Sequence, residues 1–468
     1  MPDYLTPGVY VEEIPHLPPS VTAVETAVPA FIGYTAKATL HQPGDLLKKA
    51  FRIQSLPEYE QYFGNPAPET ESLSVLFGGA AAVGRVDETK RSKFLMHYSL
   101  QQFFANGGGP CWIIAVGDYT SAGNTVSAQA LLQGLAVAEE QYGITLLLLP
   151  DAVNIETPEA YYGVCRAAIN QSARLQDRFT LLDVYHAAVN DNHWQQDIAL
   201  LRSSLDGQAT ALKYAAAYFP RIFTPVHFDY TINGAPDQSL IRIEGLPGGV
   251  TTLAALQQSN QAQYTAAKKA VEAIPLLLPV SPAIAGIYAM VDNTRGVWKA
   301  PANVSLNNTL QPAIAVSSNE QEGLNISIDG KSINVVRTFA GKQTLVWGAR
   351  TLDGNSNDWR YIQVKRYCIM VEQSVQLGVK TFVFEPNNQK TWVAIKTMVE
   401  NFLVQQWRAG ALSGARPQDA FFVQVGLGTT MTEQDIFEGR LVVELGLAIT
   451  RPAEFVQIRF MQKMLAES

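Results

Sequence analysis

The sequence predicts a multidomain protein that combines a parallel-type α/β core with a C-terminal α+β domain. In the middle of the chain, short apolar runs alternate with helix-like stretches, which is typical of parallel sheets covered by helices. In the last third, a long amphipathic helix precedes several strand-like runs. A strand-like segment at each end has no hairpin partner beside it, so each has a free edge that pairs inside the subunit or recruits another chain.

Residues 1–25 are predicted to form an extended arm. Five prolines fall within this segment, and proline at this density favours extended backbone over helix. Residues 6–14 alternate as in a β-strand, with Val9 and Val11 on one face and Tyr10 on the other. The arm therefore carries one strand with a face to bury.

Residues 26–110 form a variable segment of mixed character. A strand is expected at 30–34 and a helix at 95–106. The stretch 84–93 begins with glycine and is rich in charged residues, which predicts a loop.

Residues 111–350 are predicted to form the α/β core. A surface insertion is expected near 226–260, where Asn-Gly and Pro-Gly-Gly turns separate short strands, and an alanine-rich helix follows at 261–274. Because helix-like stretches separate most of the apolar runs, we expect the runs to be strands of a sheet that is buried on both faces. These runs are 112–116, 144–149, 179–184, 214–219 and 276–280.

Residues 351–450 are predicted to form the C-terminal α+β domain. Its helix, at 389–408, places apolar side chains at helical spacing, which indicates a packed core and not a cofactor site. Strands are expected at 381–384, 420–425 and 441–447.

The final segment, residues 451–468, is predicted to carry a second terminal strand. Val456, Ile458 and Phe460 share one side of an alternating run. Two pairings are open for both terminal strands. Each strand pairs inside its own subunit, as most terminal strands do, or its free edge recruits another chain.

The composition is ordinary for a soluble globular protein, with an apolar fraction of 47% over 468 residues. The net charge of −7 and the scattered basic residues argue against a nucleic acid or an anionic membrane surface as a partner. Cys111, Cys165 and Cys368 lack the spacing of a disulfide framework or a zinc site, which favours a reducing compartment. Since neither a signal peptide nor an apolar run of membrane-spanning length is visible, we expect synthesis in the cytoplasm.

One pattern favours an enzyme. Asp118, Asp151 and Asp183 each lie at or just beyond the end of an expected parallel strand, where open α/β sheets place their ligands, so a metal-dependent hydrolase with Mg²⁺ is one hypothesis. The structural alternative is that each aspartate caps the helix or turn that follows its strand. The second role is the more frequent one, and we assign no catalytic residue, no metal ligand and no cofactor.

A series of motifs runs in order along nearly the whole chain. The N-terminal motifs cover 7–13 and 28–33, and the central motifs cover 281–289, Asp292 and 295–303. The remaining motifs are Trp347 to Leu352, Trp359 to Ile362, Phe384 to Asn387, Gly410 to Leu412, Asp435, Gly439 to Leu441 and Arg451 to Phe455. In this order they resemble contractile phage-tail sheath proteins.

The resemblance implies a non-enzymatic subunit that stacks as six-membered rings around an inner tube and contracts to drive the tube through a target membrane. It also implies baseplate and terminator proteins as partners, and assembly in a phage tail or in a released phage-tail-like particle. A tail terminator or baseplate protein that shares the C-terminal domain is the alternative within this resemblance.

The resemblance further implies which residues join neighbouring subunits. Val9, Tyr10 and Val11 would form one donated strand, and Val456, Ile458 and Phe460 the other. The acceptor sheet would contain the strands around Phe384, Val423 and Val443. The signature residues Arg295, Trp298, Pro301 and Arg350 would fix the junction between the core and the C-terminal domain, with the arginines making bidentate hydrogen bonds.

Overall fold

The computed structural model gives two compact units. We call residues 25–370 together with 451–455 the larger unit, and residues 20–24 together with 371–450 the C-terminal unit. The structure describes residues 20–69, 71–79, 81–185, 193–231, 240–247, 249 and 251–455. The residues expected to be donated between subunits lie outside these ranges, namely Val9, Tyr10, Val11, Val456, Ile458 and Phe460.

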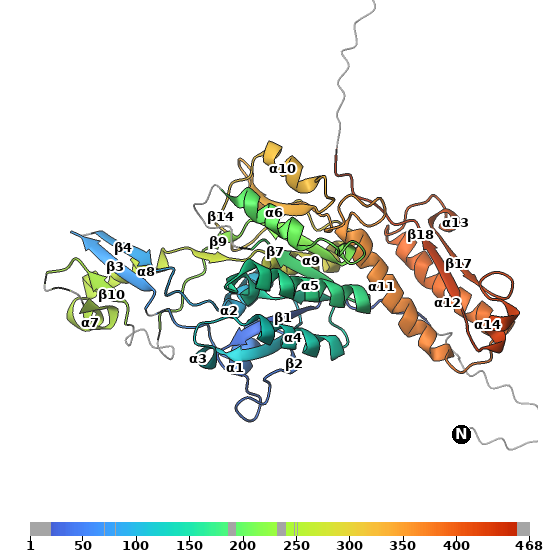
Figure 1. Ribbon diagram of the computed structural model, residues 1–468, viewed down its shortest axis with the longest axis horizontal. Coiled ribbons are helices and arrows are strands. Elements are labelled where there is room, and N and C mark those ends of the chain that lie inside the picture. The colour runs from blue at the N-terminus through green and yellow to red at the C-terminus, as the bar shows by residue number, and fades with distance from the viewer. Residues whose placement is uncertain are drawn as a thin grey trace, which may run out of the picture. The chain divides into compact units, whose positions relative to one another are not determined.

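The larger unit is built on a nine-stranded mixed sheet with the order β13-β16-β15-β8-β7-β6-β1-β5-β2. Strands β1, β2 and β7 of this sheet are labelled in Figure 1. The six central strands, from β15 to β5, are parallel, and the outer strands are joined to the sheet by antiparallel pairs. The strands are β1 (Pro29–Thr35), β2 (Ala50–Ile53), β5 (Cys111–Asp118), β6 (Leu146–Leu148), β7 (Phe179–Asp183), β8 (Ala215–Phe219), β13 (Val304–Ser305), β15 (Ile333–Thr338) and β16 (Thr344–Trp347). Four of the five strands expected in the core, and the strand expected at 30–34, are confirmed as members of this sheet.

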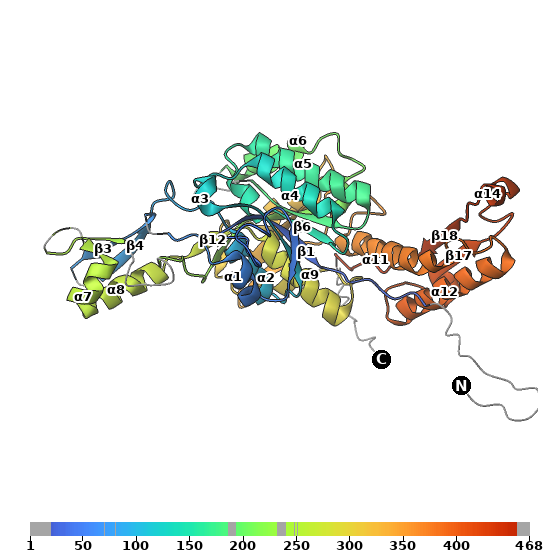
Figure 2. The ribbon, with the colours of Figure 1, turned by 90° about the horizontal axis from the view of Figure 1, so that it is seen from below.

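Helices cover both faces of the sheet (Figure 2). On one side lie α4 (Ala128–Glu140) and α5 (Pro158–Leu175), and on the other lie α2 (Met96–Ala105) and α9 (Ser281–Arg295). Alternating side chains of each strand enter the two cores. In β1, Ile32 packs in the first core, and Phe31 meets Phe103 of α2 edge-on at 5.2 Å in the second. The runs are therefore apolar throughout because both of their faces are buried.

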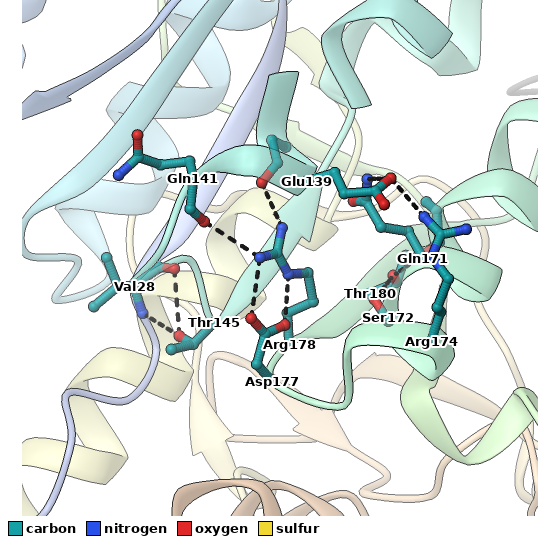
Figure 3. A network of polar contacts seen from close by, with 12 residues as sticks. Val28, Glu139, Gln141, Thr145, Gln171, Ser172, Arg174, Asp177, Arg178 and Thr180 are labelled. Carbon is teal, nitrogen blue, oxygen red and sulfur yellow. Dashed lines mark hydrogen bonds and ion pairs between the residues drawn. The ribbon is translucent and has the colours of Figure 1, made fainter. Parts of the chain in front are cut away.

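A buried arginine fixes α4 against the start of β7 (Figure 3). The side chain of Arg178 is 1% exposed, and it donates hydrogen bonds to the carbonyl oxygens of Ala138 at 2.7 Å and Gln141 at 3.3 Å. The neighbouring Asp177 carboxylate accepts from its Nε at 2.7 Å. Carbonyl groups at a helix C-terminus lack intrahelical donors, so the guanidinium satisfies them and places positive charge where the helix dipole favours it.

A second sheet joins two segments that are far apart in the sequence. Its order is β11-β10-β3-β4, and β10 pairs with β3 in parallel. The expectation of a loop at 84–93 is wrong for its first residues, which belong to β4. Gly84 predicted a turn, but a Cβ atom here would lie 2.4 Å from the carbonyl oxygen of Ala270, so glycine allows a helix to pack closely on the strand. The elements are β3 (Leu73–Gly78), β4 (Ala81–Val86), β10 (Arg242–Glu244), β11 (Thr251–Thr252), α7 (Leu253–Ser259) and α8 (Gln261–Glu272).

Shorter elements complete the larger unit. The run expected at 276–280 is confirmed as a strand at Leu276–Leu278, but it belongs to a three-stranded antiparallel sheet with the order β12-β9-β14. The remaining elements are β9 (Ile222–Thr224), β12 (Leu276–Leu278), β14 (Gln311–Pro312), α1 (Leu56–Phe63), α3 (Tyr119–Ala122), α6 (Trp194–Ser204), α10 (Ser318–Asn325) and the 3-10 helices Pro150–Asn154 and Leu212–Tyr214.

The C-terminal unit contains the end of α11 (Ile362–Val379), which begins in the larger unit, and α12 (Gln389–Arg408). The helix expected at 389–408 is confirmed, and Ile395, Val399 and Phe402 are buried along its stripe. Its other elements are the 3-10 helix Lys380–Phe382, α13 (Pro417–Ala420), α14 (Glu433–Phe437), β17 (Phe421–Val425) and β18 (Val443–Leu447). Among the described residues, no helix is both long and apolar enough to span a bilayer.

The expectation of a strand at 381–384 is wrong. The chain continues from α11 into the 3-10 helix Lys380–Phe382, and the Val383 N–H bonds to the carbonyl oxygen of Lys380. Phe384 follows with φ 72° and a fully exposed side chain. The run resembles a strand in composition, but local hydrogen bonds to the preceding turn take the place of a partner strand.

Candidate assembly site

The structure does not bring the three candidate metal ligands together. Asp118 ends β5 and caps α3, where its carboxylate accepts hydrogen bonds from the Ser121 N–H at 2.8 Å and from the Ser121 hydroxyl at 2.7 Å. The hydrogen bonds from Ser121 hold the pKa of Asp118 below its ordinary value. The first aspartate is therefore a helix cap.

Asp151 is fully buried and anchors two segments of backbone. Its carboxylate accepts from the N–H of Tyr34 at 2.7 Å and from the N–H of Leu95 at 2.5 Å. Burial raises its pKa to about 7, although these hydrogen bonds act in the opposite direction. The contact needs the glycine at position 33, since a Cβ atom there would lie 2.3 Å from the carboxylate oxygen.

Asp183, at the end of β7, holds the start of α9. Its carboxylate accepts from the N–H of Val280 at 2.8 Å, and from both the N–H and the hydroxyl of Ser281 at 3.1 and 2.5 Å. Burial raises its pKa. All three carboxylates are thus occupied by separate donors. Within the described ranges, no group of three His, Cys, Asp or Glu residues has a metal-binding arrangement. Asp118 alone caps the helix that follows its strand, whereas Asp151 and Asp183 bind backbone N–H groups of segments far away in the sequence.

The C-terminal unit contains a sheet of only two strands. β17 and β18 are antiparallel, with Val423 opposite Leu445 and Val425 opposite Val443. No third strand pairs with either of them in the part of the chain that the structure describes. An isolated two-stranded sheet is only marginally stable, and unpaired edges present free N–H and C=O groups. The sheet is therefore open to added strands.

The two faces of this sheet differ. Val423 is buried, whereas Phe422 on the opposite face is 52% exposed. The ring of Phe422 lies across Gly446, where a Cβ atom would be 2.0 Å from a ring carbon. Phe384, the third residue expected in the acceptor sheet, lies outside it in the loop after α11.

Some large apolar side chains of the C-terminal unit are exposed to solvent. They are Val383, Phe384, Val393, Phe422, Leu427, Phe437 and Val442.

The described part of the N-terminal arm is fixed to α11. The N–H of Val24 donates to the Ser374 hydroxyl at 3.0 Å. Val21 is 9% exposed, and it packs so close to Gly378 that a Cβ atom at that glycine would lie 2.8 Å from its methyl group. The root of the arm is thus a defined attachment point for the residues that precede it.

The root of the C-terminal arm is held by a charged cluster in the larger unit. Arg350 donates to both carboxylate oxygens of Glu454, from Nε at 2.9 Å and from an Nη atom at 2.7 Å, and its other Nη atom donates to the Gly354 carbonyl oxygen at 3.0 Å. Tyr361 and Asn325 donate to the same carboxylate at 3.0 and 2.8 Å. Burial acts to raise the pKa of Glu454, but the hydrogen bonds from Arg350 and Asn325 outweigh it and the pKa lies below its ordinary value.

Replacing Glu454 by Gln is expected to loosen the root of the C-terminal arm. The variant loses the charge that Arg350 meets, and a hydrogen bond to a charged group contributes about 1.5–3 kcal/mol. Amides within 451–455 should therefore exchange with solvent roughly ten- to a hundredfold faster. Hydrogen exchange with mass spectrometry measures this. The control is Glu322→Gln on the exposed face of α10, and equal exchange in both variants would show that the cluster does not hold the arm.

The other signature residues have different surroundings. Arg295 is exposed at the end of α9, and in the described chain its side chain makes no hydrogen bond, unlike the expected bidentate contact. Trp298 meets Tyr367 of α11 edge-on at 6.3 Å, and Pro301 is buried.

Sequence reasoning missed a buried ion pair of the larger unit. Arg366 in α11 binds Asp292 in α9 through two parallel hydrogen bonds of 3.0 and 2.5 Å, and both side chains are about 95% buried. Asp292 stands within the central signature, but no sequence signal connects it to an arginine 74 positions away.

Comparisons with known proteins agree with this architecture. Residues 355–463 match the phage tail sheath C-terminal domain family. A chain in the 6-fold symmetrised structure of the anti-feeding prophage (AFP) baseplate is 30% identical, with 99% of this chain and 100% of that chain covered, and the TM-score is 0.64. No curated protein matches the chain.

Two contracted sheaths also match. A chain of the AFP helical sheath in the contracted state is 29% identical over 98% of this chain and 100% of that chain, with a TM-score of 0.64. A chain of the sheath complex of PVC, an extracellular contractile injection system, in the contracted state is 27% identical over 99% of both chains, with a TM-score of 0.64. The fold and the open sheet therefore define a structural protein of contractile tail-like particles. The chain belongs to the contractile tail sheath family.

Proposed function

We propose that this protein is the sheath subunit of a contractile injection particle, in which it stacks as hexameric rings around an inner tube. Contraction of the sheath drives the tube through a target membrane. The extended lattice is metastable, and contraction moves the subunits into a lattice with more buried contact, so assembly stores the free energy that contraction releases.

Neighbouring subunits are joined by strand addition in this proposal. The strand with Val9, Tyr10 and Val11 comes from one neighbour, and the strand with Val456, Ile458 and Phe460 from another. The acceptor is the sheet of β17 and β18, which contains Val423 and Val443. The observation that carries the proposal is that this sheet has two strands and free edges in the described chain.

The attachment of both arm roots supports this mechanism. Val24 is tied to α11, and Glu454 is tied to Arg350. An arm that is fixed at its base transmits tension to the body of its subunit, whereas a loose arm would only tether it. The exposed apolar residues of the C-terminal unit supply surface that added strands and neighbouring subunits can bury.

The proposed partners are other copies of this chain, the inner tube protein, and baseplate and terminator proteins. We place its synthesis in the bacterial cytoplasm and its final location in a phage tail or in a released extracellular particle. A role at the baseplate is a second candidate, because chains of AFP baseplate structures match at 30% and 25% identity. A sheath subunit forms long tubes, whereas a baseplate or terminator subunit stops at a single ring.

Deleting residues 1–14 is expected to leave a folded subunit that cannot form tubes. The deletion removes the proposed donor strand and keeps the root at Val21 and Val24, so the unfolding transition should change little. Negative-stain microscopy of the chain expressed with its tube protein measures assembly. Deletion of residues 1–5 is the matched control, because it keeps the strand and should assemble. Normal contractile tubes from the longer deletion would contradict the proposal.

A further inference from the structure

Two lysine side chains of the larger unit share the same pair of aromatic rings. The ammonium group of Lys365 lies 4.3 Å from the ring centre of Tyr214 and 4.8 Å from that of Trp359. The ammonium group of Lys213 lies 5.7 and 5.1 Å from the same two ring centres. Two positive charges therefore meet at one small aromatic site.

The two positive charges of this site have an acidic neighbour, Asp353, which interacts with Lys213 without forming an ion pair in the described chain. Lys365 is only 3% exposed, yet in the described ranges the ammonium group of neither lysine forms an ion pair or a hydrogen bond. Asp353 is the nearby acid: burial raises its pKa, Lys213 acts to lower it, and it forms no ion pair with either ammonium group. The site carries an excess of positive charge.

The aromatic rings satisfy this charge only in part. A ring face attracts a desolvated cation, but it does not replace the three oxygen acceptors that an ammonium group binds in water. A carboxylate offers two charged oxygens, so it can accept from both lysines at once. Lys213 and Trp359 are half-buried, which leaves the site open to a group that arrives from outside.

We propose that Lys213 and Lys365, framed by Tyr214 and Trp359, form a docking site for a carboxylate side chain of a second copy of this chain. The inference rests on the proposed self-assembly. Charge complementarity favours this occupant, because the chain carries 42 acidic residues against 35 basic ones, and copies of a net-negative subunit repel one another unless contacts of this kind offset the repulsion.

The site lies at the start of α11, so a carboxylate bound there acts on this helix. Trp359 lies three residues before the start of α11 and Lys365 lies in its first turn, and α11 is the helix that continues into the C-terminal unit. A carboxylate from a neighbour thus fixes the start of this helix.

Carbodiimide cross-linking of assembled tubes tests the proposal with the wild-type chain. The reagent joins a lysine to a carboxylate that touches it, and tubes made from mixed ¹⁴N and ¹⁵N subunits distinguish links between copies from links within one chain. We expect mixed-isotope peptides that join Lys213 or Lys365 to an Asp or Glu, present in tubes and absent from monomers. Links from these lysines to Asp353 alone would overturn the inference.

A double variant gives an independent measurement. Lys213→Met with Lys365→Met should raise the critical concentration for tube formation roughly tenfold or more, since the loss of a close charge pair costs over 1.4 kcal/mol. Lys213→Met alone should show part of this effect. Because Lys213 is only half-buried, this single variant still tests the inference if the change at the buried Lys365 impairs folding. The control is Lys268→Met, whose lysine is exposed beside Glu272. Equal assembly of all variants would overturn the inference.

Two further outcomes separate the inference from the proposed function. If the wild-type chain forms no tubes, the proposed function fails and the inference fails with it. If tubes form without an inter-copy link at these lysines, only the inference fails. Sodium acetate that raises the unfolding temperature of the wild-type monomer, but not of the double variant, in the absence of any inter-copy link would assign the site to a small anion and overturn the second-copy occupant.

Discussion

The Arg366→Met variant is expected to lose about 3–5 kcal/mol of unfolding free energy, because removal of one partner leaves a buried charge unpaired. Both side chains of the Arg366–Asp292 pair are about 95% buried, and the guanidinium group also lies 4.5 Å from the ring centre of Tyr288. Chemical denaturation of the unassembled subunit, followed by tryptophan fluorescence, measures the loss.

Two variants test this explanation. The double change Arg366→Met with Asp292→Leu removes both charges, so it should be less destabilising than Arg366→Met alone. Arg174→Met is the matched control, because Arg174 pairs with Glu139 at the surface, where its side chain is 61% exposed, and such a pair contributes about 0–1 kcal/mol. An equal loss in Arg366→Met and Arg174→Met would contradict the prediction.

Asp151 is expected to make the subunit less stable as the pH rises. Its folded pKa of about 7 lies above the value of about 3.9 in an unfolded chain. The folded state therefore binds the proton more tightly, and this contribution is complete below about pH 4 and lost as the pH rises through 7. Between these limits the wild-type subunit should lose roughly 4 kcal/mol more than an Asp151→Asn variant, which cannot titrate here.

The pH slope is the deciding measurement, because Asp151→Asn also changes the hydrogen bonds to Tyr34 and Leu95. Asp118→Asn is the matched control, because the contribution of Asp118 to stability is expected to depend on pH in the opposite direction. The pKa of Asp118 is lowered by Ser121, so its contribution is present above the unfolded pKa and is lost as the pH falls. Parallel pH profiles for the wild type and Asp151→Asn would contradict the prediction.

The layered core could be predicted from the sequence because a strand that is buried on both faces must be apolar throughout. Three of the predicted runs contain the central strands β6, β7 and β8. The helix at 389–408 was equally predictable, since its polar Asn388 cap and its apolar stripe follow local rules. The prediction of a strand at 381–384 was wrong because composition cannot show whether a partner strand exists.

The candidate site was less predictable. The sequence placed Val423 and Val443 in a sheet of the C-terminal domain, but it also placed Phe384 there, and the loop after α11 carries that residue elsewhere. In the sequence, all three aspartates lie at the end of an expected strand and cannot be told apart. In the fold, Asp118 caps a helix at the surface, whereas Asp151 and Asp183 are buried and accept hydrogen bonds from backbone N–H groups.

The sequence by itself determined the class of fold, the family and the positions of most strands and helices, because periodicity, caps and turns act between residues that are close in the chain. Only the tertiary structure decided which distant residues meet. It joined Arg366 to Asp292, Arg350 to Glu454, and β3 to β10. Such pairs depend on packing and desolvation between segments that are far apart in the chain, and no local sequence pattern indicates that these segments meet. These contacts contribute to the stability of the folded subunit.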